Sequence, residues 1–255
     1  MQWDPAQYLA FGDLRLRPAV DLLARLPEAA PGRVADLGCG AGNVTGLLAA
    51  RWPQAQITGV DSSPDMLAKA KAAVPGADFV ESDIAGWLPE AAPEVIFTNA
   101  ALQWLDDHES LFPSLVGRLA PGGRIAIQMP RNHGEPSHQA MLETVEDGPW
   151  TERLRPVSRA QPVATPERYY EILAPQASEL DIWETIYLQQ LDGENPVKEW
   201  TKGTALRPYL AALEGAEREA FEAAYGARIL AAYPPAADGR TLFPFRRLFI
   251  VARRA

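Results

Sequence analysis

A strand-like apolar run that leads directly into three alternating glycines constrains the fold of this chain more than any other feature. The segment Val34-Ala-Asp-Leu-Gly-Cys-Gly-Ala-Gly-Asn43 places Gly38, Gly40 and Gly42 where a strand gives way to a helical pattern. Glycine has no Cβ and adopts positive φ, so it lets bare backbone approach a ligand at such a turn. A second strand-like run ends at Asp61, where a carboxylate can accept hydrogen bonds from ribose hydroxyls. The pattern predicts a ribose-containing ligand at the carboxyl edge of a parallel sheet.

The glycine spacing and the acidic residue before it distinguish between such ligands. Dinucleotide-binding turns use G-x-G-x-x-G, which would require glycine at the position of Asn43. A pyrophosphate prefers helix-end N–H groups, and Asp36 would oppose it. The same carboxylate suits a ligand with an ammonium and a sulfonium. The segment resembles the first motif of the class I S-adenosylmethionine-dependent methyltransferases, and the resemblance extends from about Arg33 to Met129. The alternative is a generic tight turn beside a surface aspartate.

Composition limits the partners that this chain can have. Its 255 residues carry a net charge of −9, which argues against a nucleic-acid or anionic-membrane surface. It shows no signal-peptide pattern and no apolar run that would span a membrane. The single cysteine, Cys39, cannot form an internal disulfide, so we expect a cytoplasmic protein. The few Cys and His residues lack metal-ligand spacing, so we expect no metal, and no obligate protein partner is evident.

Alternating strand and helix patterns over residues 33–129 predict an α/β fold. The resemblance implies a Rossmann-like, mostly parallel seven-stranded sheet with helices on both faces and a helical cap. The expected strands are Arg33–Leu37, Ile57–Val60, Ala77–Glu81, Val95–Thr98, Arg124–Gln128, Leu180–Leu191 and Arg247–Ala252, the last two as an antiparallel edge hairpin. The expected helices are Pro18–Leu26, Asn43–Arg51, Pro64–Ala73, His108–Leu119, Pro196–Lys202 and Glu214–Ala232.

We expect one methyltransferase domain over residues 1–255. Its core would comprise about 30–130 together with the late strands at about 180–191 and 246–253. The cap elements would comprise about 1–20, 131–178 and 193–240.

The resemblance also implies which residues bind S-adenosylmethionine. Asp36 and the glycine loop would hold its amino-acid part, and Asp61 its ribose. Asp83 and the Ile84 backbone would contact the adenine, and Asn99 would lie near the transferable methyl. Asp83 and Asn99 have an alternative role as helix or turn caps. The complete predicted set is Asp36, Gly38, Gly40, Gly42, Asp61, Ser62, Met66, Asp83, Ile84, Asn99 and Leu102.

Four further segments carry a more specific pattern: Tyr8-Leu-Ala-Phe11 with Arg15 and Arg17-Pro18, Asn99-Ala-Ala-Leu-Gln-Trp104, Gln128-Met-Pro-Arg-Asn132, and Trp200-Thr-Lys-Gly-Thr-Ala-Leu-Arg-Pro208. They are similar to segments of the trans-aconitate 2-methyltransferases. This similarity implies methyl-ester formation on a carboxylate of a small polycarboxylic acid. Because a carboxylate is already ionised at neutral pH, no general base and hence no catalytic residue is expected. The predicted substrate-binding residues are Arg207, Arg131, His133, Trp200, Tyr209, Tyr8, Phe11 and Arg15.

Other functions remain open at this point. A malonyl-carrier-protein methyltransferase would need a basic docking face, which the net charge of −9 disfavours. Another small-molecule C- or O-methyltransferase would usually need a base near the methyl group. From a different class, the chain could be a non-catalytic S-adenosylmethionine-binding protein. Arg207 has the alternative of a surface cap or ion pair, and Trp200 that of a core residue.

Overall fold

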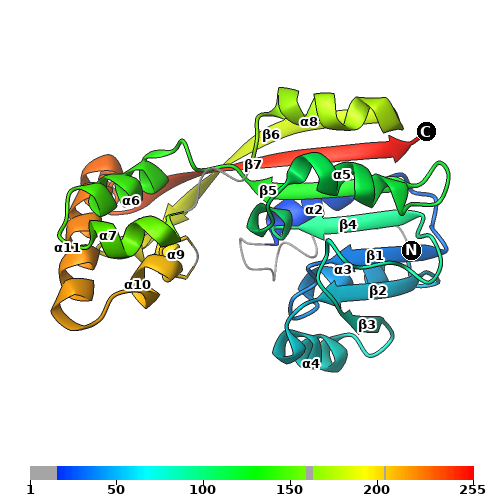
Figure 1. Cartoon of the computed structure of the whole chain (residues 1–255), viewed down its shortest axis with the longest axis horizontal. Coiled ribbons are helices and arrows are strands. Elements are labelled where there is room, and N and C mark those ends of the chain that lie inside the picture. The colour runs from blue at the N-terminus through cyan, green and yellow to red at the C-terminus, as the bar shows by residue number, and fades with distance from the viewer. Residues whose placement is uncertain (1–15, 159–162, 204) are drawn as a thin grey trace. The chain divides into compact units, whose positions relative to one another are not determined.

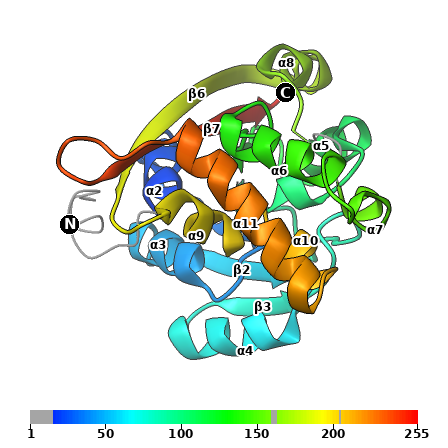
Figure 2. The same ribbon diagram turned by 90° about the vertical axis from the view of Figure 1, so that its left-hand side faces the viewer.

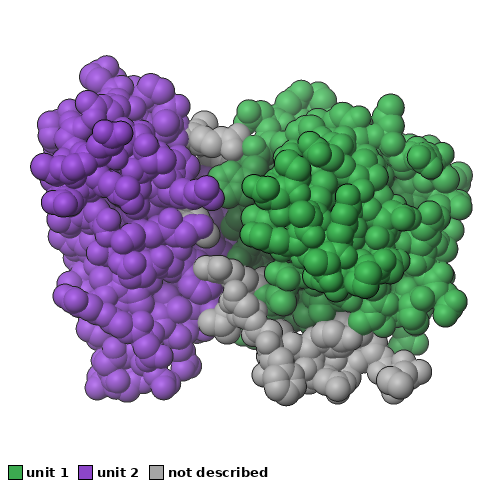
Figure 3. Space-filling view, turned by 90° about the horizontal axis from the view of Figure 1, so that it is seen from below, with its two compact units in different colours: residues 1–130, 162–185, 247–255 green, residues 131–161, 186–246 purple. Residues whose placement is uncertain are grey.

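The computed structural model describes residues 16–158, 163–203 and 205–255. The chain divides into two compact units, which Figure 3 colours green and purple. Unit 1 comprises residues 1–130, 162–185 and 247–255, and unit 2 comprises residues 131–161 and 186–246. Strands β6 (Ala177–Leu191) and β7 (Thr241–Arg254) each contribute residues to both units.

The described strands form a seven-stranded sheet in the order β3-β2-β1-β4-β5-β7-β6. Strand β1 pairs in parallel with β2 and β4, whereas β7 runs antiparallel to β5. The predicted Rossmann-like, mostly parallel sheet is therefore confirmed. The strand order reverses between β1 and β4, which is where ligands bind in open α/β sheets. The other strands are β1 (Arg33–Leu37), β2 (Gln56–Asp61), β3 (Asp78–Glu81), β4 (Val95–Asn99) and β5 (Arg124–Pro130).

Contacts at both ends of β6 and β7 show that these two strands are antiparallel. Ser178 donates a hydrogen bond to the carbonyl of Arg253 at 3.4 Å. At the other end, Arg240, which directly precedes β7, donates to the side chain of Gln190. The predicted antiparallel edge pair is thus present, with β6 at the sheet edge.

Helices cover both faces of the sheet in unit 1 (Figure 1). Ile125, Ile127 and Met129 on one face of β5 belong to a core cluster that also contains Phe112 of α5 and Tyr169 of α8. Helix α2 packs against β5 and α3, on the other face. The helices of this unit are α2 (Arg17–Leu23), α3 (Asn43–Arg51), α4 (Pro64–Ala73), η1 (Leu102–Trp104), α5 (His108–Gly117), α8 (Pro166–Leu173) and η3 (Ala174–Gln176).

Unit 2 is a helical unit with its own core, in which α11 packs along α6 and α9 (Figure 2). Aromatic side chains dominate this core, including Trp150, Phe221, Tyr225 and Phe243. Its helices are α6 (Pro136–Glu146), α7 (Thr151–Leu154), η2 (Arg155–Val157), α9 (Pro196–Lys202), α10 (Arg207–Ala211) and α11 (Gly215–Ala232). None of the described helices is long and apolar enough to cross a membrane.

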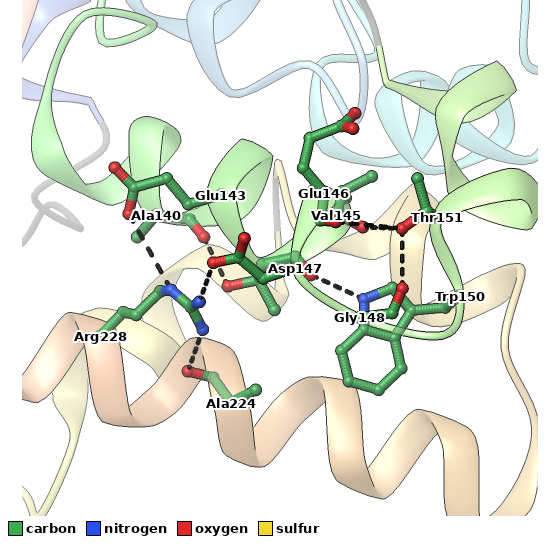
Figure 4. A network of polar contacts seen from close by, with 11 residues as sticks. Ala140, Glu143, Val145, Glu146, Asp147, Gly148, Trp150, Thr151, Ala224 and Arg228 are labelled. Atoms are coloured by element: carbon green, nitrogen blue, oxygen red, sulfur yellow. Dashed lines mark hydrogen bonds and ion pairs between the residues drawn. The ribbon is translucent and has the colours of Figure 1, made fainter.

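Polar contacts fasten α11 to α6 and close the turn after α6 (Figure 4). Arg228 of α11 donates to Asp147 at 2.6 Å and to the carbonyl of Ala224 at 3.4 Å. In the turn, the buried indole of Trp150 donates to the carbonyl of Thr144 at 2.7 Å. These groups are satisfied within unit 2, which gives them a structural role.

The predicted cap segment 131–178 is divided between the two units. Residues 131–161 lie in unit 2, whereas α8 lies in unit 1 and packs against α5. Tyr169 and Leu173 explain this placement, because both are fully buried in the core beneath the sheet. An amphipathic pattern predicts that a helix has a buried face but does not identify the element that covers it.

Candidate active site

The glycine loop lies between β1 and α3, as the sequence predicts, and its backbone is left-handed at alternate positions. Gly38, Gly40 and Gly42 have φ values of +74°, +54° and +86°. A Cβ on Gly38 would lie only 2.3 Å from the Cβ of Ala101, so a side chain there would collide with the segment after β4. A Cβ on Gly40 would meet no atom within 4 Å in the part of the chain that the structure describes. The backbone at Gly40 therefore borders open space, as a ligand-binding loop requires.

Asp61, at the end of β2, braces this loop. Its Oδ2 accepts from the N–H of Gly40 at 2.9 Å, and its Oδ1 accepts from the N–H of Ser63 at 2.9 Å. A carboxylate oxygen has two lone pairs, so each oxygen retains capacity for a further hydrogen bond. The carboxylate can thus hold the loop and accept from two hydroxyl groups of a ligand.

Asp36, on β1, is a buried carboxyl that favours a cationic ligand. It is 1% exposed, and its Oδ2 accepts from the hydroxyl of Thr45 at 2.7 Å. Burial raises the pKa of Asp36 to about 7; the Thr45 hydrogen bond lowers it, and the charge of Asp61 adds to the increase. A cation placed beside Asp36 would stabilise its ionised form. Thr45 was not predicted, although a hydroxyl in the first turn of α3 is a signal for such a contact.

The segment after β3 is held by contacts that sequence reasoning could not specify. Oδ1 of Asp83 accepts from the N–H of Ala85 at 2.8 Å, so this side chain caps a turn. A turn cap is the alternative role that the sequence predicts for Asp83. Arg118 donates to the carbonyl of Ile84 at 2.9 Å. The Ile84 side chain is 8% exposed, whereas Ser62 and Met66 are exposed. Among the described residues, no hydrogen bond occupies the second carboxylate oxygen of Asp83 or the N–H of Ile84, so both can bind a ligand.

The ends of β4 and β5 place two side-chain amides next to each other. Asn99 is paired in register with Gln128. Oδ1 of Asn99 is buried and has no hydrogen-bond partner among the described residues. Gln128 is 0% exposed, and both polar atoms of its side chain likewise lack a partner in this part of the chain. Leu102 is fully buried in the apolar core, so its role there is packing.

The predicted substrate residues that the structure describes all belong to unit 2. Tyr209 is 7% exposed and stacks on Phe221, and Trp200 packs against Phe243 and Phe245. Both are therefore part of, or pack against, an aromatic core. Three other predicted substrate residues lie elsewhere in this unit. The backbone N–H of Arg131 donates to the carbonyl of Arg246, and the ring of His133 lies 5.1 Å from that of His138. Arg207 is exposed at the start of α10. Tyr8, Phe11 and Arg15 lie outside the described residues.

No group of three or more His, Cys, Asp or Glu side chains among the described residues is arranged to hold a metal ion. The polar groups gathered at the carboxyl edge of β1, β2, β3 and β4 instead suit an organic ligand with a cation, hydroxyl groups and a polar ring.

Comparison with known proteins identifies the family. A family model described as a methyltransferase domain matches residues 34–123. The trans-aconitate 2-methyltransferase of Azoarcus sp. (strain BH72) is 52% identical over 252 residues, which cover 99% of each chain. That of Rhodopseudomonas palustris (strain BisB18) is 50% identical and covers 98% of each chain. The chain belongs to the trans-aconitate 2-methyltransferase family.

Solved structures support the fold of this methyltransferase. The YcgJ protein of Bacillus subtilis aligns with a TM-score of 0.59 at 15% identity and covers 92% of this chain and 96% of its own. Phosphoethanolamine N-methyltransferase 2 of Haemonchus contortus, solved in complex with S-adenosyl-L-methionine, aligns with a TM-score of 0.58 at 17% identity. That alignment covers 98% of this chain and 57% of the other. At these identities the likeness shows the fold alone.

Proposed function

We propose that this methyltransferase uses S-adenosylmethionine to form a monomethyl ester on trans-aconitate or a closely related polycarboxylic acid. The observation that carries the choice of acid is the 52% identity to a trans-aconitate 2-methyltransferase over 99% of both chains. The observation that carries the choice of cofactor is the buried carboxyl of Asp36 beside the open backbone of Gly40.

The order of the strands arranges the proposed cofactor contacts along one edge of the sheet. Asp83 and Ile84 follow β3 and would contact the adenine, with Ser62 and Met66 nearby. Asp61 ends β2 and would accept from the ribose hydroxyls. Asp36 on β1, with Gly38, Gly40 and Gly42, would hold the cationic amino-acid part. Asn99 ends β4, the neighbour of β1 in the sheet, and its amide would lie at the methyl end of this row.

The proposed chemistry requires alignment rather than a catalytic base. S-adenosylmethionine supplies an electrophilic methyl group on a sulfonium. The carboxylate acceptor is ionised at neutral pH, so no proton has to be removed. An O–C bond forms as the C–S bond breaks, and the opposite charges of the two reactants are neutralised. A site that excludes water favours this step, and the protein's contribution is to position the two groups.

Arg207 is expected to bind the acid rather than the cofactor. Its guanidinium is exposed at the start of α10, and an arginine binds a carboxylate through two parallel hydrogen bonds. We expect Arg207→Ala to raise the KM for the acid roughly tenfold, the value of one charged hydrogen bond, and to leave S-adenosylmethionine affinity unchanged. Arg218→Ala, at another exposed arginine of unit 2, is the matched control. An unchanged KM would make Arg207 a surface residue.

Asp61 is expected to contribute to the affinity for S-adenosylmethionine rather than to binding of the acid. Asp61→Ala removes the proposed ribose contacts, each worth roughly 1.5–3 kcal/mol, and also releases the N–H groups of Gly40 and Ser63. We expect S-adenosylmethionine affinity to fall at least about tenfold in a calorimetric titration. Asp61→Asn keeps one oxygen acceptor and should lose less. Unchanged affinity in both variants would rule out the ribose role.

The acceptor can be identified with radiolabelled S-adenosylmethionine and a panel of acids. Trans-aconitate, cis-aconitate, isocitrate and malonyl-carrier protein would be compared, and we expect trans-aconitate to acquire base-labile label fastest. Preferential labelling of the carrier protein would replace the proposed substrate. Absence of label on every acid, with cofactor binding intact, would favour a non-catalytic binding protein.

We also propose that the protein works in the cytoplasm on a free small molecule. Cys39 is buried and is the only cysteine of the chain, so an internal disulfide is impossible. This is compatible with a reducing compartment.

A further inference from the structure

Gln128 is a buried polar side chain that the contacts described above leave unsatisfied. It is 0% exposed at the carboxyl end of β5, and neither its Oε1 nor its Nε2 has a hydrogen-bond partner among the described residues. A buried donor or acceptor that lacks a partner destabilises the folded state, because it has lost its hydrogen bonds to water. A bound group that accepts from Nε2 would recover this free energy, so Gln128 is placed to bind a ligand.

The sheet register shows which face Gln128 occupies. Asp36 pairs with Phe97, and Asn99, two residues further along β4, points to the same face as Phe97. Asn99 in turn pairs with Gln128. The three side chains of Asp36, Asn99 and Gln128 therefore point to one face of the sheet. The proposed cofactor contacts run from β3 to β4 in strand order, so Gln128 lies one strand beyond the methyl end, where the acceptor must approach.

A buried arginine follows on the next strand and the same face. Gln128 pairs with Phe249 of β7, and Arg247 precedes Phe249 by two residues, so it shares that face. Diagonal neighbours on paired strands lie about 7–8 Å apart, within reach of long side chains. Arg247 is 7% exposed and belongs to unit 1, as Gln128 does. This face thus offers a neutral donor and, next to it, a cation.

We propose that Gln128 and Arg247 form the acceptor subsite, a role that rests on the proposed function. Nε2 of Gln128 would donate to the carboxylate that receives the methyl group, and Arg247 would bind a second carboxylate of the same acid. A neutral amide orients the reacting carboxylate without withdrawing as much of its negative charge as a guanidinium would. The cation of Arg247 also explains how a chain of net charge −9 can bind a polyanion, because the local potential governs the site.

Gln128→Leu tests the proposal. We expect the KM for trans-aconitate to rise at least about tenfold, which corresponds to about 1.4 kcal/mol, whereas the dissociation constant of S-adenosylmethionine stays within about twofold. Thr98→Val is the matched control, because Thr98 is also fully buried on β4 but precedes Asn99 and so points to the opposite face. The control should retain the wild-type KM. An unchanged KM in Gln128→Leu would overturn the proposal.

Gln128→Glu supplies a second readout that a purely structural role would not produce. It preserves the shape of the side chain and adds a negative charge next to the acceptor. We expect its KM at saturating cofactor to exceed that of Gln128→Leu at about pH 8 and to fall as the introduced carboxyl is protonated toward about pH 6. The wild-type KM should stay constant over this range. A flat profile for Gln128→Glu with a wild-type KM would also overturn the proposal.

The labelling assay and the Gln128 variants test the proposed function and the acceptor subsite separately. If the wild-type enzyme labels no acid of the panel, the proposed function fails and the acceptor subsite fails with it. If the wild-type enzyme labels trans-aconitate but both Gln128 variants retain its KM, only the acceptor subsite is wrong. Cofactor titration and thermal unfolding of each variant show whether its fold is intact.

Discussion

Replacing Asp36 by asparagine is expected to stabilise the free enzyme and, at the same time, to weaken its binding of S-adenosylmethionine. The carboxyl is 1% exposed and its pKa is raised to about 7, chiefly by burial, so above this pH a buried charge is maintained at a cost in folding free energy. Asparagine has nearly the same shape and can still accept from the hydroxyl of Thr45. It lacks the charge that the cationic part of the cofactor would require. We expect affinity to fall roughly tenfold to a hundredfold, as for loss of one charged hydrogen bond.

The stability difference between the wild type and the Asn variant should depend on pH. The pKa of Asp36 is 3.8 in the unfolded chain and about 7 in the folded protein, so the folded state binds the proton more tightly. The contribution of protonated Asp36 to folding stability is fully present below pH 3.8 and is lost as the pH rises to about 7. The Asn variant lacks this loss and should exceed the wild type in Tm by several degrees at about pH 8. Cofactor affinity of the wild type should increase as pH rises through about 7, because a cation binds the ionised form.

Thermal unfolding and calorimetric titration of both proteins at several pH values test these expectations. A variant with a lower Tm than the wild type at about pH 8 would show that the buried carboxylate stabilises the free protein. Unchanged affinity would show that Asp36 does not contact the cationic part of the cofactor.

Gly40→Ala is expected to fold and to lose cofactor binding. A Cβ at Gly40 would meet no atom of the described residues within 4 Å, so the substitution causes no collision with that part of the chain. The φ of +54° costs an L-residue roughly 1–2 kcal/mol. The new methyl group would project into the open space where the proposed cofactor lies against bare backbone. We expect S-adenosylmethionine affinity to fall by about a hundredfold or more, because the cofactor can avoid the clash only by giving up loop contacts.

Two other glycines separate this steric effect from backbone strain. Gly215 has a φ of +51°, and a Cβ there would likewise meet no atom within 4 Å among the residues with a described structure, but it begins α11 in unit 2. Gly215→Ala should therefore show the same modest loss of Tm with normal cofactor affinity. Gly38→Ala should unfold at a much lower temperature, because its Cβ would lie 2.3 Å from that of Ala101. Equal S-adenosylmethionine affinities in Gly40→Ala and Gly215→Ala would show that the cofactor does not bind against the glycine loop.

The sequence predicts those elements best whose ends carry their own local signals. The predicted bounds of α3 and α4 match the structure, because a glycine precedes α3, and Ser63 with Pro64 begins α4. β7 begins at Thr241 rather than at the predicted Arg247, because Pro244 interrupts the strand pattern. The residues around it form the part of β7 that belongs to unit 2.

Some residues of the candidate site are likewise predictable from local sequence, whereas others depend on tertiary contacts. Asp36 and Asp61 are predicted from their places beside the glycine loop, and the structure places both at that loop. Their contacts with Thr45 and Gly40 depend on how α3 and β2 meet it. The unsatisfied amide of Gln128 cannot be read from sequence, because it depends on the pairing of β5 with β4 and β7. An apolar strand that contains one glutamine is equally compatible with a satisfied core residue.

Carboxylate esterification is best tested by the ¹³C spectrum of the product formed from trans-aconitate and methyl-¹³C S-adenosylmethionine. We expect one labelled O-methyl resonance, with correlation from the methyl protons to a carboxyl carbon, and its conversion to methanol by mild alkali. A labelled methyl group bonded to carbon of the acid, or an unchanged cofactor signal after prolonged incubation, would contradict esterification of a carboxylate by this enzyme.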